Sequence, residues 1–112
     1  MDKNKEIFVE KIREYLKVQN DYLNYLEEHF EFIRYRNITK ISEIEHLLDI
    51  VLGMFQTSET MDLYTRICLY YHAIDRQGAM EYAQFYLEMY NDDRVIREVM
   101  KVERLIKRYE KK

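Results

Sequence analysis

The chain has 112 residues and a formal net charge of −3, and 47% of its residues are hydrophobic while 35% are charged. A chain of this size and composition is expected to form one soluble domain, residues 1–112, with a single core. The composition argues against long disordered tails, and no apolar run approaches the ~20 residues that a membrane-spanning helix requires. We therefore expect no membrane association.

Charge is distributed unevenly along the chain. Residues 37–93 contain three basic and ten acidic residues, which gives −7, whereas residues 94–112 contain eight basic and three acidic residues, which gives +5. Such asymmetry indicates an interaction surface, unless the two segments neutralise one another in the fold. The single cysteine, Cys68, allows no intrachain disulfide, and the N-terminus lacks a signal-peptide core, so we expect a cytoplasmic protein.

Proline is absent and glycine occurs only at positions 53 and 78, while hydrophobic residues recur at helical spacing from Ile7 to Tyr109. A proline inside a helix costs roughly 3 kcal/mol and a glycine about 1 kcal/mol, so a chain without these residues favours helix nearly throughout. The sequence predicts an all-α fold of about five helices, arranged as a helical bundle or a short helical stack.

The first predicted helix covers residues 3–36 and would be roughly 50 Å long. Its hydrophobic residues follow a near-heptad pattern, interrupted by Gln19, which is typical of helices that pair. Three arrangements remain open: the helix bends near Gln19 and Asn20, it packs on a second chain, or it lies across its own bundle. We expect a homo-oligomer, a dimer formed through this N-terminal helix.

Four shorter helices are expected after a turn at residues 37–41. Ser42 and Glu45 have the spacing of a capping box that begins the second helix, and Gly53 lies inside that helix, where it suggests close approach of another backbone. The third helix is expected over residues 59–75, with Gly78 as its left-handed terminator. Residues 79–90 and 94–111 form the fourth and fifth helices.

Residues 63–99 resemble a tetratricopeptide (TPR) unit. With Gly78 at the turn between the helices, Ala83 and Leu87 occupy the small and large packing positions of the second helix. Tyr71 and Tyr90 stand where the family has small residues, so an ordinary helical bundle stays the alternative. The resemblance implies a scaffold that binds peptides or partner proteins and catalyses no reaction.

Two residue pairs have spacings found in catalytic or metal sites. Glu43 and His46 form a Glu-x-x-His pair, but a di-metal bundle needs a second copy of that pair, which the sequence lacks. Arg66 and His72 resemble the Arg-x(4–6)-His motif of HEPN-type ribonucleases, in which such a pair would bind phosphate and transfer protons. No glycine-rich phosphate loop or zinc-ligand cluster is present, so we expect no enzyme, no cofactor and no bound metal.

Two groups of residues are candidate partner-binding surfaces. Basic residues recur along one side of the last helix, where they would contact an acidic protein partner or, less favoured, a nucleic acid, or remain solvated; they are Arg94, Arg97, Lys101, Arg104 and Arg108. Tyrosines would line a groove between the third and fourth helices or pack in the core; they are Tyr64, Tyr71, Tyr82, Tyr86 and Tyr90. We predict a small protein–protein interaction module, such as an adaptor, regulator or inhibitor, with the HEPN-like ribonuclease and the nucleic-acid binder as alternatives.

Overall fold

The computed structural model describes residues 2–111 and contains five α-helices over that range, without any strand. The helices are α1 (Lys3–Tyr35), α2 (Ile41–Leu52), α3 (Ser58–His72), α4 (Arg76–Tyr90) and α5 (Arg94–Glu110). The prediction of an all-α fold with a long N-terminal helix is confirmed. None of these helices is both long enough and apolar enough to cross a lipid bilayer.

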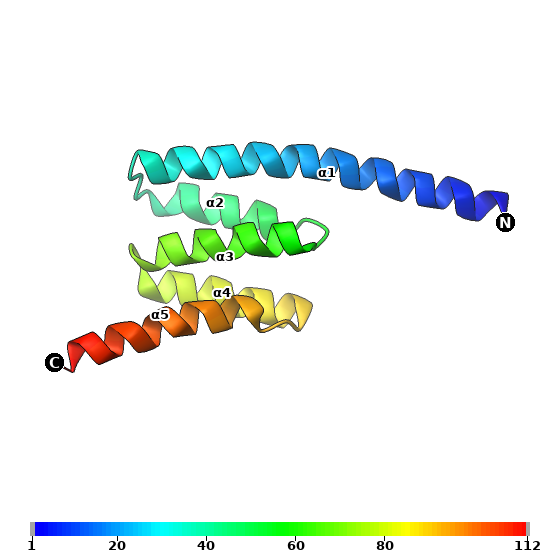
Figure 1. Cartoon of the computed structure of the whole chain (residues 1–112). Coiled ribbons are helices and arrows are strands. Elements are labelled where there is room, and N and C mark those ends of the chain that lie inside the picture. The colour runs from blue at the N-terminus through cyan, green and yellow to red at the C-terminus, as the bar shows by residue number, and fades with distance from the viewer. Residues whose placement is uncertain (1, 112) are drawn as a thin grey trace.

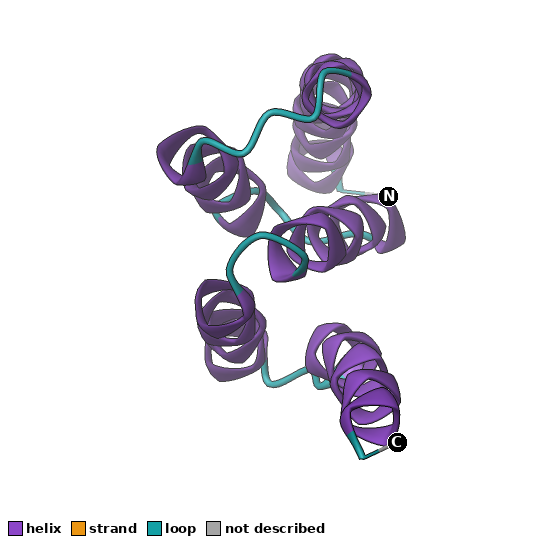
Figure 2. Ribbon diagram, turned by 90° about the vertical axis from the view of Figure 1, so that its left-hand side faces the viewer, coloured by secondary structure: helices purple, strands orange, loops and turns teal. Residues whose placement is uncertain are grey.

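Consecutive helices run antiparallel and form two rows. Figure 2 shows α1, α3 and α5 in one row and α2 and α4 in the other, so that the chain zigzags between the rows. Helix α3 lies at the centre, because it packs against each of the other four helices. Short connections enforce this arrangement, since an antiparallel neighbour is the nearest place where an amphipathic helix can bury its apolar face.

The core is centred on α3, whose Leu63, Tyr64, Ile67, Cys68 and Tyr71 are fully buried. Helices α2, α4 and α5 each contribute one apolar face to it, whereas α1 contributes residues only from its second half. Every buried side-chain nitrogen and oxygen atom in the described part of the chain has a hydrogen-bond partner. The core therefore contains no unpaired polar side-chain atom among the described residues, and its packing holds α3 in place relative to the other helices.

Helix α1 is a single uninterrupted helix from Lys3 to Tyr35, and it curves along its length (Figure 1). Gln19 is the first buried residue of α1, and its side-chain amide binds the backbone of Phe55 at both ends: Nε2 donates to the Phe55 carbonyl at 2.7 Å, and the Phe55 N–H donates to Oε1 at 2.9 Å. Phe55 lies in the connection between α2 and α3, and this connection forms the end of the bundle beside Gln19. Residues 3–18 of α1 extend past that end, and we call them the α1 overhang (Figure 1).

The overhang gives the molecule an elongated shape. Its principal extents are 65 × 30 × 17 Å and its radius of gyration is 16.8 Å, whereas a compact chain of this length has a radius of gyration of about 13 Å. Figure 1 also shows the C-terminal end of α5 extending beyond the other helices on the opposite side. The interpretation that α1 lies across its own bundle is therefore wrong for its first half.

Several predicted helix ends are displaced. Helix α2 begins at Ile41 with Lys40 as its cap, so Ser42 lies within the first turn and the predicted capping box is wrong. A capping box does begin α3, where Thr57 and Thr60 each bond the other's backbone N–H. Gly53 is the C-terminal cap of α2, and an added Cβ there would meet only carbonyl oxygens of α2 at 3.6 Å or more, so the expected close approach of another backbone is absent.

Gly78 does not terminate α3, which ends at His72. It lies in the first turn of α4, where its N–H donates to Oδ1 of the cap residue Asp75 at 3.0 Å. An added Cβ would lie 2.7 Å from Cζ of Tyr71 and closer still to its hydroxyl oxygen. The glycine is needed here because α3 and α4 approach closely at Tyr71. Helix α4 begins at Arg76, three residues earlier than predicted, because Asp75 is its N-terminal cap.

Candidate binding surfaces

The predicted tyrosine groove between α3 and α4 is not open in the structure. Four of the five tyrosines, namely Tyr64, Tyr71, Tyr82 and Tyr86, are buried, and Tyr90 is half-buried. Their hydroxyls donate to acceptors within the chain, for example from Tyr64 to the Tyr82 carbonyl at 2.6 Å and from Tyr82 to Oδ1 of Asp49 at 2.9 Å. Burial raises the pKa of the four buried phenols, to about 12 at Tyr86. These side chains hold the helices together and are inaccessible to a partner.

The structure does not bring Arg66 and His72 to one site. Arg66 extends toward α1, where Nη2 lies 2.8 Å from Oε1 of Glu27, and its Nε donates to Asp62 at 2.9 Å. His72 is buried on another side of α3, with Nε2 at 2.5 Å from Oε1 of Glu103 on α5. A ribonuclease pair must face one phosphodiester from a shared, open surface, and these two side chains contact different helices.

Glu103 completes a partly buried charge cluster that the sequence did not reveal, in which His72 and Glu103 are buried and Arg76 is exposed. Its carboxylate accepts bonds from His72 and from Arg76, whose Nη2 lies 2.7 Å from Oε2. The Arg76 guanidinium, and after it His72, lower the pKa of Glu103 to about 2. The cluster joins α3, α4 and the middle of α5, and therefore fixes the position of α5 against the bundle.

No metal site is formed in the described part of the chain, because no group of three or more His, Cys, Asp or Glu side chains is arranged to hold an ion between residues 2 and 111. Glu43 and His46 do line a small pocket between α1 and α2, of about 240 Å³, together with His29 from α1. Burial also raises the pKa of Cys68 well above its usual range, so this thiol is no reactive nucleophile.

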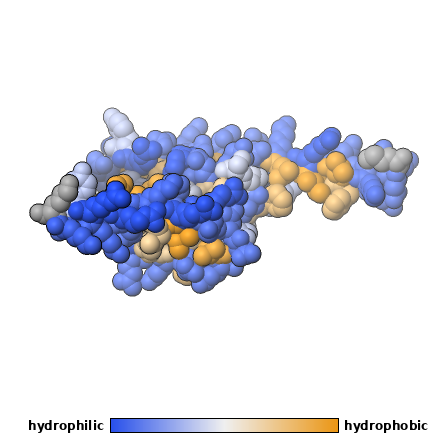
Figure 3. Space-filling model, turned by 60° about the horizontal axis from the view of Figure 1, so that its bottom comes forward, coloured by the Kyte–Doolittle hydropathy of each residue, from blue (hydrophilic) through white to orange (hydrophobic). Residues whose placement is uncertain are grey.

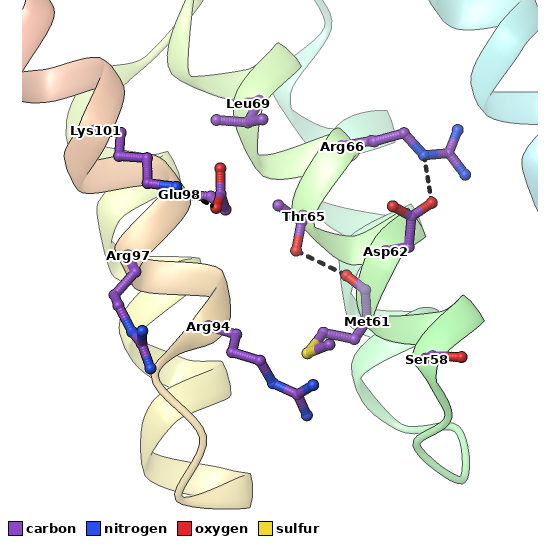
Figure 4. A pocket seen from close by; sticks show the side chains of 10 residues that line it. All are labelled: Ser58, Met61, Asp62, Thr65, Arg66, Leu69, Arg94, Arg97, Glu98 and Lys101. Atoms are coloured by element: carbon purple, nitrogen blue, oxygen red, sulfur yellow. Dashed lines mark hydrogen bonds and ion pairs between the residues drawn. The ribbon is translucent and has the colours of Figure 1, made fainter.

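A groove between α3 and α5 brings predicted and unpredicted residues together (Figure 4). We call it the α3–α5 groove, and its volume is about 560 Å³. Residues of α3 form one wall and residues of α5 form the other, and Figure 4 shows Arg94 extending across the opening toward Met61. The lining residues are Ser58, Met61, Asp62, Thr65, Arg66, Leu69, Arg94, Arg97, Glu98 and Lys101.

The α5 wall of the groove carries three exposed cations, each paired with a neighbouring carboxylate that is exposed or, at Asp92, half-buried. Arg94 bonds Asp92 at 2.6 Å, Arg97 bonds Asp93 at 2.7 Å and Lys101 bonds Glu98 at 2.9 Å. Hydrogen bonds from the side chain and the backbone N–H of Arg94 lower the pKa of Asp92 to about 2. Exposed pairs of this kind contribute only about 0–1 kcal/mol each, so a carboxylate of a partner can displace the internal one at little cost.

Between the charged walls the α3–α5 groove has a partly apolar floor. Met61 and Leu69 are half-buried there, one helical turn on either side of Thr65, whose hydroxyl donates to the Met61 carbonyl. A groove with an apolar floor and cationic margins suits a chain that carries both carboxylates and apolar side chains.

Arg104 and Arg108 continue the row of predicted basic residues but lie outside the groove. Neither forms an ion pair with any residue between 2 and 111, and both are exposed on the part of α5 beyond Glu103. In Figure 3 the basic face of α5 is seen as a strongly hydrophilic band across the near side of the molecule. The predicted row is therefore divided between a groove wall and a free helix end.

The α1 overhang is the second candidate surface. Exposed fractions are 65% for Phe8, 43% for Ile12, 59% for Tyr15 and 68% for Val18, and no residue between 2 and 18 is buried. Figure 3 shows hydrophobic side chains gathered on this extension, at the right of the view. This run of exposed aromatic and aliphatic side chains on one helix makes the α1 overhang a candidate interaction surface.

Comparisons with protein families, with curated proteins and with solved structures found no significant match to this chain. The assignment of a function therefore depends on the surfaces described above. Sequence periodicity was sufficient to find the α5 wall of the groove. It missed the contribution of α3, because no local pattern shows that Met61, Thr65 and Leu69 lie opposite α5.

Proposed function

We propose that the protein is a non-catalytic protein-interaction module that binds an acidic segment of a partner protein in the α3–α5 groove. The observation that carries this proposal is the placement of Arg94, Arg97 and Lys101 along one margin of a groove whose floor contains Met61 and Leu69. The cations would attract carboxylates, and the floor would accept apolar side chains that alternate with them.

The zigzag of two helix rows supports an interaction role. In helical-repeat scaffolds, including the TPR family, stacked helix pairs create long surfaces that bind extended peptides. The α3–α5 groove lies between neighbouring helices of one row, which is where such a stack leaves a furrow. We propose on this ground that residues 63–99 act as a TPR-like unit, made of most of α3, all of α4 and the start of α5.

A catalytic role receives less support. The buried contact of His72 with Glu103 removes the imidazole from any surface that RNA could reach. Nucleic-acid binding also receives less support, since the protein is acidic, with a pI of about 5.7, whereas nucleic-acid-binding domains are generally basic. The pairs that α5 forms with Asp92, Asp93 and Glu98 also reduce its positive field.

The proposal is tested with two charge-reversal variants on one helix. Arg97→Glu/Lys101→Glu alters the groove wall, and Arg104→Glu/Arg108→Glu makes the same change in net charge outside the groove. We expect a labelled peptide that alternates Glu with Leu, measured by fluorescence anisotropy, to bind the wild type and the second variant but not the first. Far-UV circular dichroism serves as the control for folding.

Two results would contradict the proposal. Equal loss of peptide binding in both variants would show that net charge, and not the groove, is responsible. Binding of a labelled duplex or single-stranded oligonucleotide that depends on Arg104 and Arg108 and falls steeply with salt, without peptide binding, would favour the nucleic-acid alternative.

A second part of the proposal concerns self-association. The exposed apolar residues of the α1 overhang, including Phe8 and Ile12, support a homo-oligomer formed through the N-terminal helix. The overhang and the α3–α5 groove involve different helices, so an oligomer would carry several grooves and could bind a multivalent partner more tightly than one chain does.

A further inference from the structure

We propose that the α1 overhang pairs with the overhang of a second copy of the chain as an antiparallel helix dimer, in a register that places Val9 opposite Ile12 and brings the flanking Glu6 beside Arg13. This inference rests on the self-association part of the proposed function and specifies its partner and geometry. The α3–α5 groove plays no part in it.

The overhang continues an interface that the bundle leaves unfinished. On the second half of α1, Leu23, Leu26, Phe30 and Ile33 follow heptad spacing and are buried against α2 and α3. The same spacing continues back through Leu16, Ile12 and Val9. Leu16 still borders the start of α3 at Glu59, whereas Val9 and Ile12 lie beyond the end of the other helices and are exposed (Figure 1).

The length of the overhang fixes how far two copies can overlap. Residues 3–18 form about four and a half turns, roughly 24 Å, before the partner would meet the bundle at Gln19. Full antiparallel overlap places Lys3 opposite Val18, and hence Val9 opposite Ile12 in both directions. These residues occupy the two core positions of the heptad, which is the pairing that antiparallel helices require.

The flanking residues favour a second copy in this antiparallel register. Glu6 and Arg13 occupy the same flanking heptad position one heptad apart, so the antiparallel arrangement brings Glu6 of each copy beside Arg13 of the other. Phe8 and Tyr15 occupy the opposite flank and meet in the same way. In a parallel pair, Arg13 would lie beside Phe8, and Glu6 would have no cation opposite it.

The dimer would also cover apolar surface near the end of the bundle. A pocket of about 470 Å³ lies between α1 and α2 and is lined by Tyr15, Val18, Tyr22 and Met54 among others. The first turns of the second copy reach this level, beside the exposed ring of Phe55.

The first test measures the mass of the protein in solution by sedimentation or light scattering. We expect the wild type to have twice the 14.0 kDa mass of one chain. The variant Phe8→Glu/Ile12→Glu is expected to be monomeric with an unchanged thermal unfolding of the bundle, because both residues lie outside the core. The control Phe32→Glu, which changes a 51% exposed aromatic residue on the second half of α1, is expected to remain dimeric.

The second test determines the register by charge exchange. Glu6→Arg and Arg13→Glu should each weaken the dimer about tenfold, because two attractive pairs become repulsive. The double variant Glu6→Arg/Arg13→Glu should restore the wild-type dissociation constant. Failure of this rescue would overturn the antiparallel register, and a monomeric wild type would overturn the dimer itself.

These outcomes are separable from those of the proposed function. A monomeric wild type that still binds the Glu–Leu peptide would refute the dimer and leave the groove proposal intact. A dimer that binds no peptide would refute the groove proposal alone.

Discussion

The two glycines of the chain should respond to alanine in opposite directions. Alanine is a better helix former than glycine by about 1 kcal/mol, so replacement of a helical glycine usually stabilises a protein. Gly53 and Gly78 both have backbone conformations that alanine can adopt, since neither has a positive φ. The difference between them lies only in what surrounds the added methyl group.

At Gly78 the methyl group would overlap a buried side chain. Its carbon would lie 2.7 Å from Cζ of Tyr71 and 2.9 Å from Oδ2 of Asp75. Tyr71 is fully buried and its hydroxyl donates to Oε2 of Glu45 at 2.7 Å, so the ring cannot move without losing that bond. Overpacking of a core costs about 1–3 kcal/mol, which exceeds the gain in helix propensity. We expect Gly78→Ala to destabilise the protein by about 1–2 kcal/mol.

At Gly53 the nearest atoms to the added carbon are carbonyl oxygens of α2 at 3.6 and 3.7 Å, which is ordinary contact. Gly53→Ala should therefore be neutral or stabilising by up to about 1 kcal/mol, chiefly because it restricts the unfolded chain. The two variants should differ by about 2 kcal/mol, or roughly 8 °C in Tm at about 4 °C per kcal/mol.

Urea and thermal unfolding followed by circular dichroism measure this difference. In a double-mutant cycle, Tyr71→Phe removes the oxygen atom nearest to the new methyl group, so the combined loss should be smaller than the sum of the two single losses. A Gly78→Ala variant as stable as Gly53→Ala would show that α3 and α4 do not approach as closely as described, and would refute the reasoning.

Three further predictions concern polar and titratable groups. Glu103→Gln should lower the free energy of unfolding by about 2 kcal/mol in chemical denaturation. The neighbouring guanidinium and imidazole lower the pKa of Glu103 from 4.5 to about 2. The contribution of this carboxylate to the free energy of unfolding should therefore be complete above pH 4.5 and disappear as the pH falls toward 2. If the stability of the Gln variant fell with the same pH profile, this prediction would be contradicted. Cys68 should resist thiol reagents until urea unfolds the chain, since burial raises its pKa, and rapid labelling of the native protein would refute the burial. Gln19→Leu should lower the free energy of unfolding by about 1–2 kcal/mol in urea denaturation, because both bonds to the Phe55 backbone are lost. The control Gln84→Leu, at an exposed position, should leave the free energy of unfolding unchanged. Equal effects of the two substitutions would contradict the role of Gln19.

Helix positions were largely predictable because they depend on local properties. The lack of proline, the spacing of apolar residues and the Thr57 cap all act within a few residues of one another, and they place α3 and α5 nearly where the structure has them. The errors occurred where distant contacts decide. Gly78 resembles a helix terminator in the sequence, but its small size is required by Tyr71 on another helix.

The candidate site was predictable only in part for the same reason. The basic row on α5 follows from its own spacing, but only the packing of α5 on α3 separates Arg97 and Lys101, which border a groove, from Arg104 and Arg108, which extend beyond it. Burial of the four tyrosines likewise depends on neighbouring helices, because an amphipathic side chain has the same spacing in a core and at an interface.

The sequence by itself determined that the chain forms helices and which side of each helix is apolar, since both properties follow from composition and period. Only the tertiary structure decided which apolar sides find a partner within the chain. Residues 9–16 and 23–33 of α1 carry the same heptad pattern, yet only the second stretch is buried. The physical reason is length: α2 and α3 are too short to reach the first half of α1, and the pattern of one helix contains no information about the extent of its neighbours.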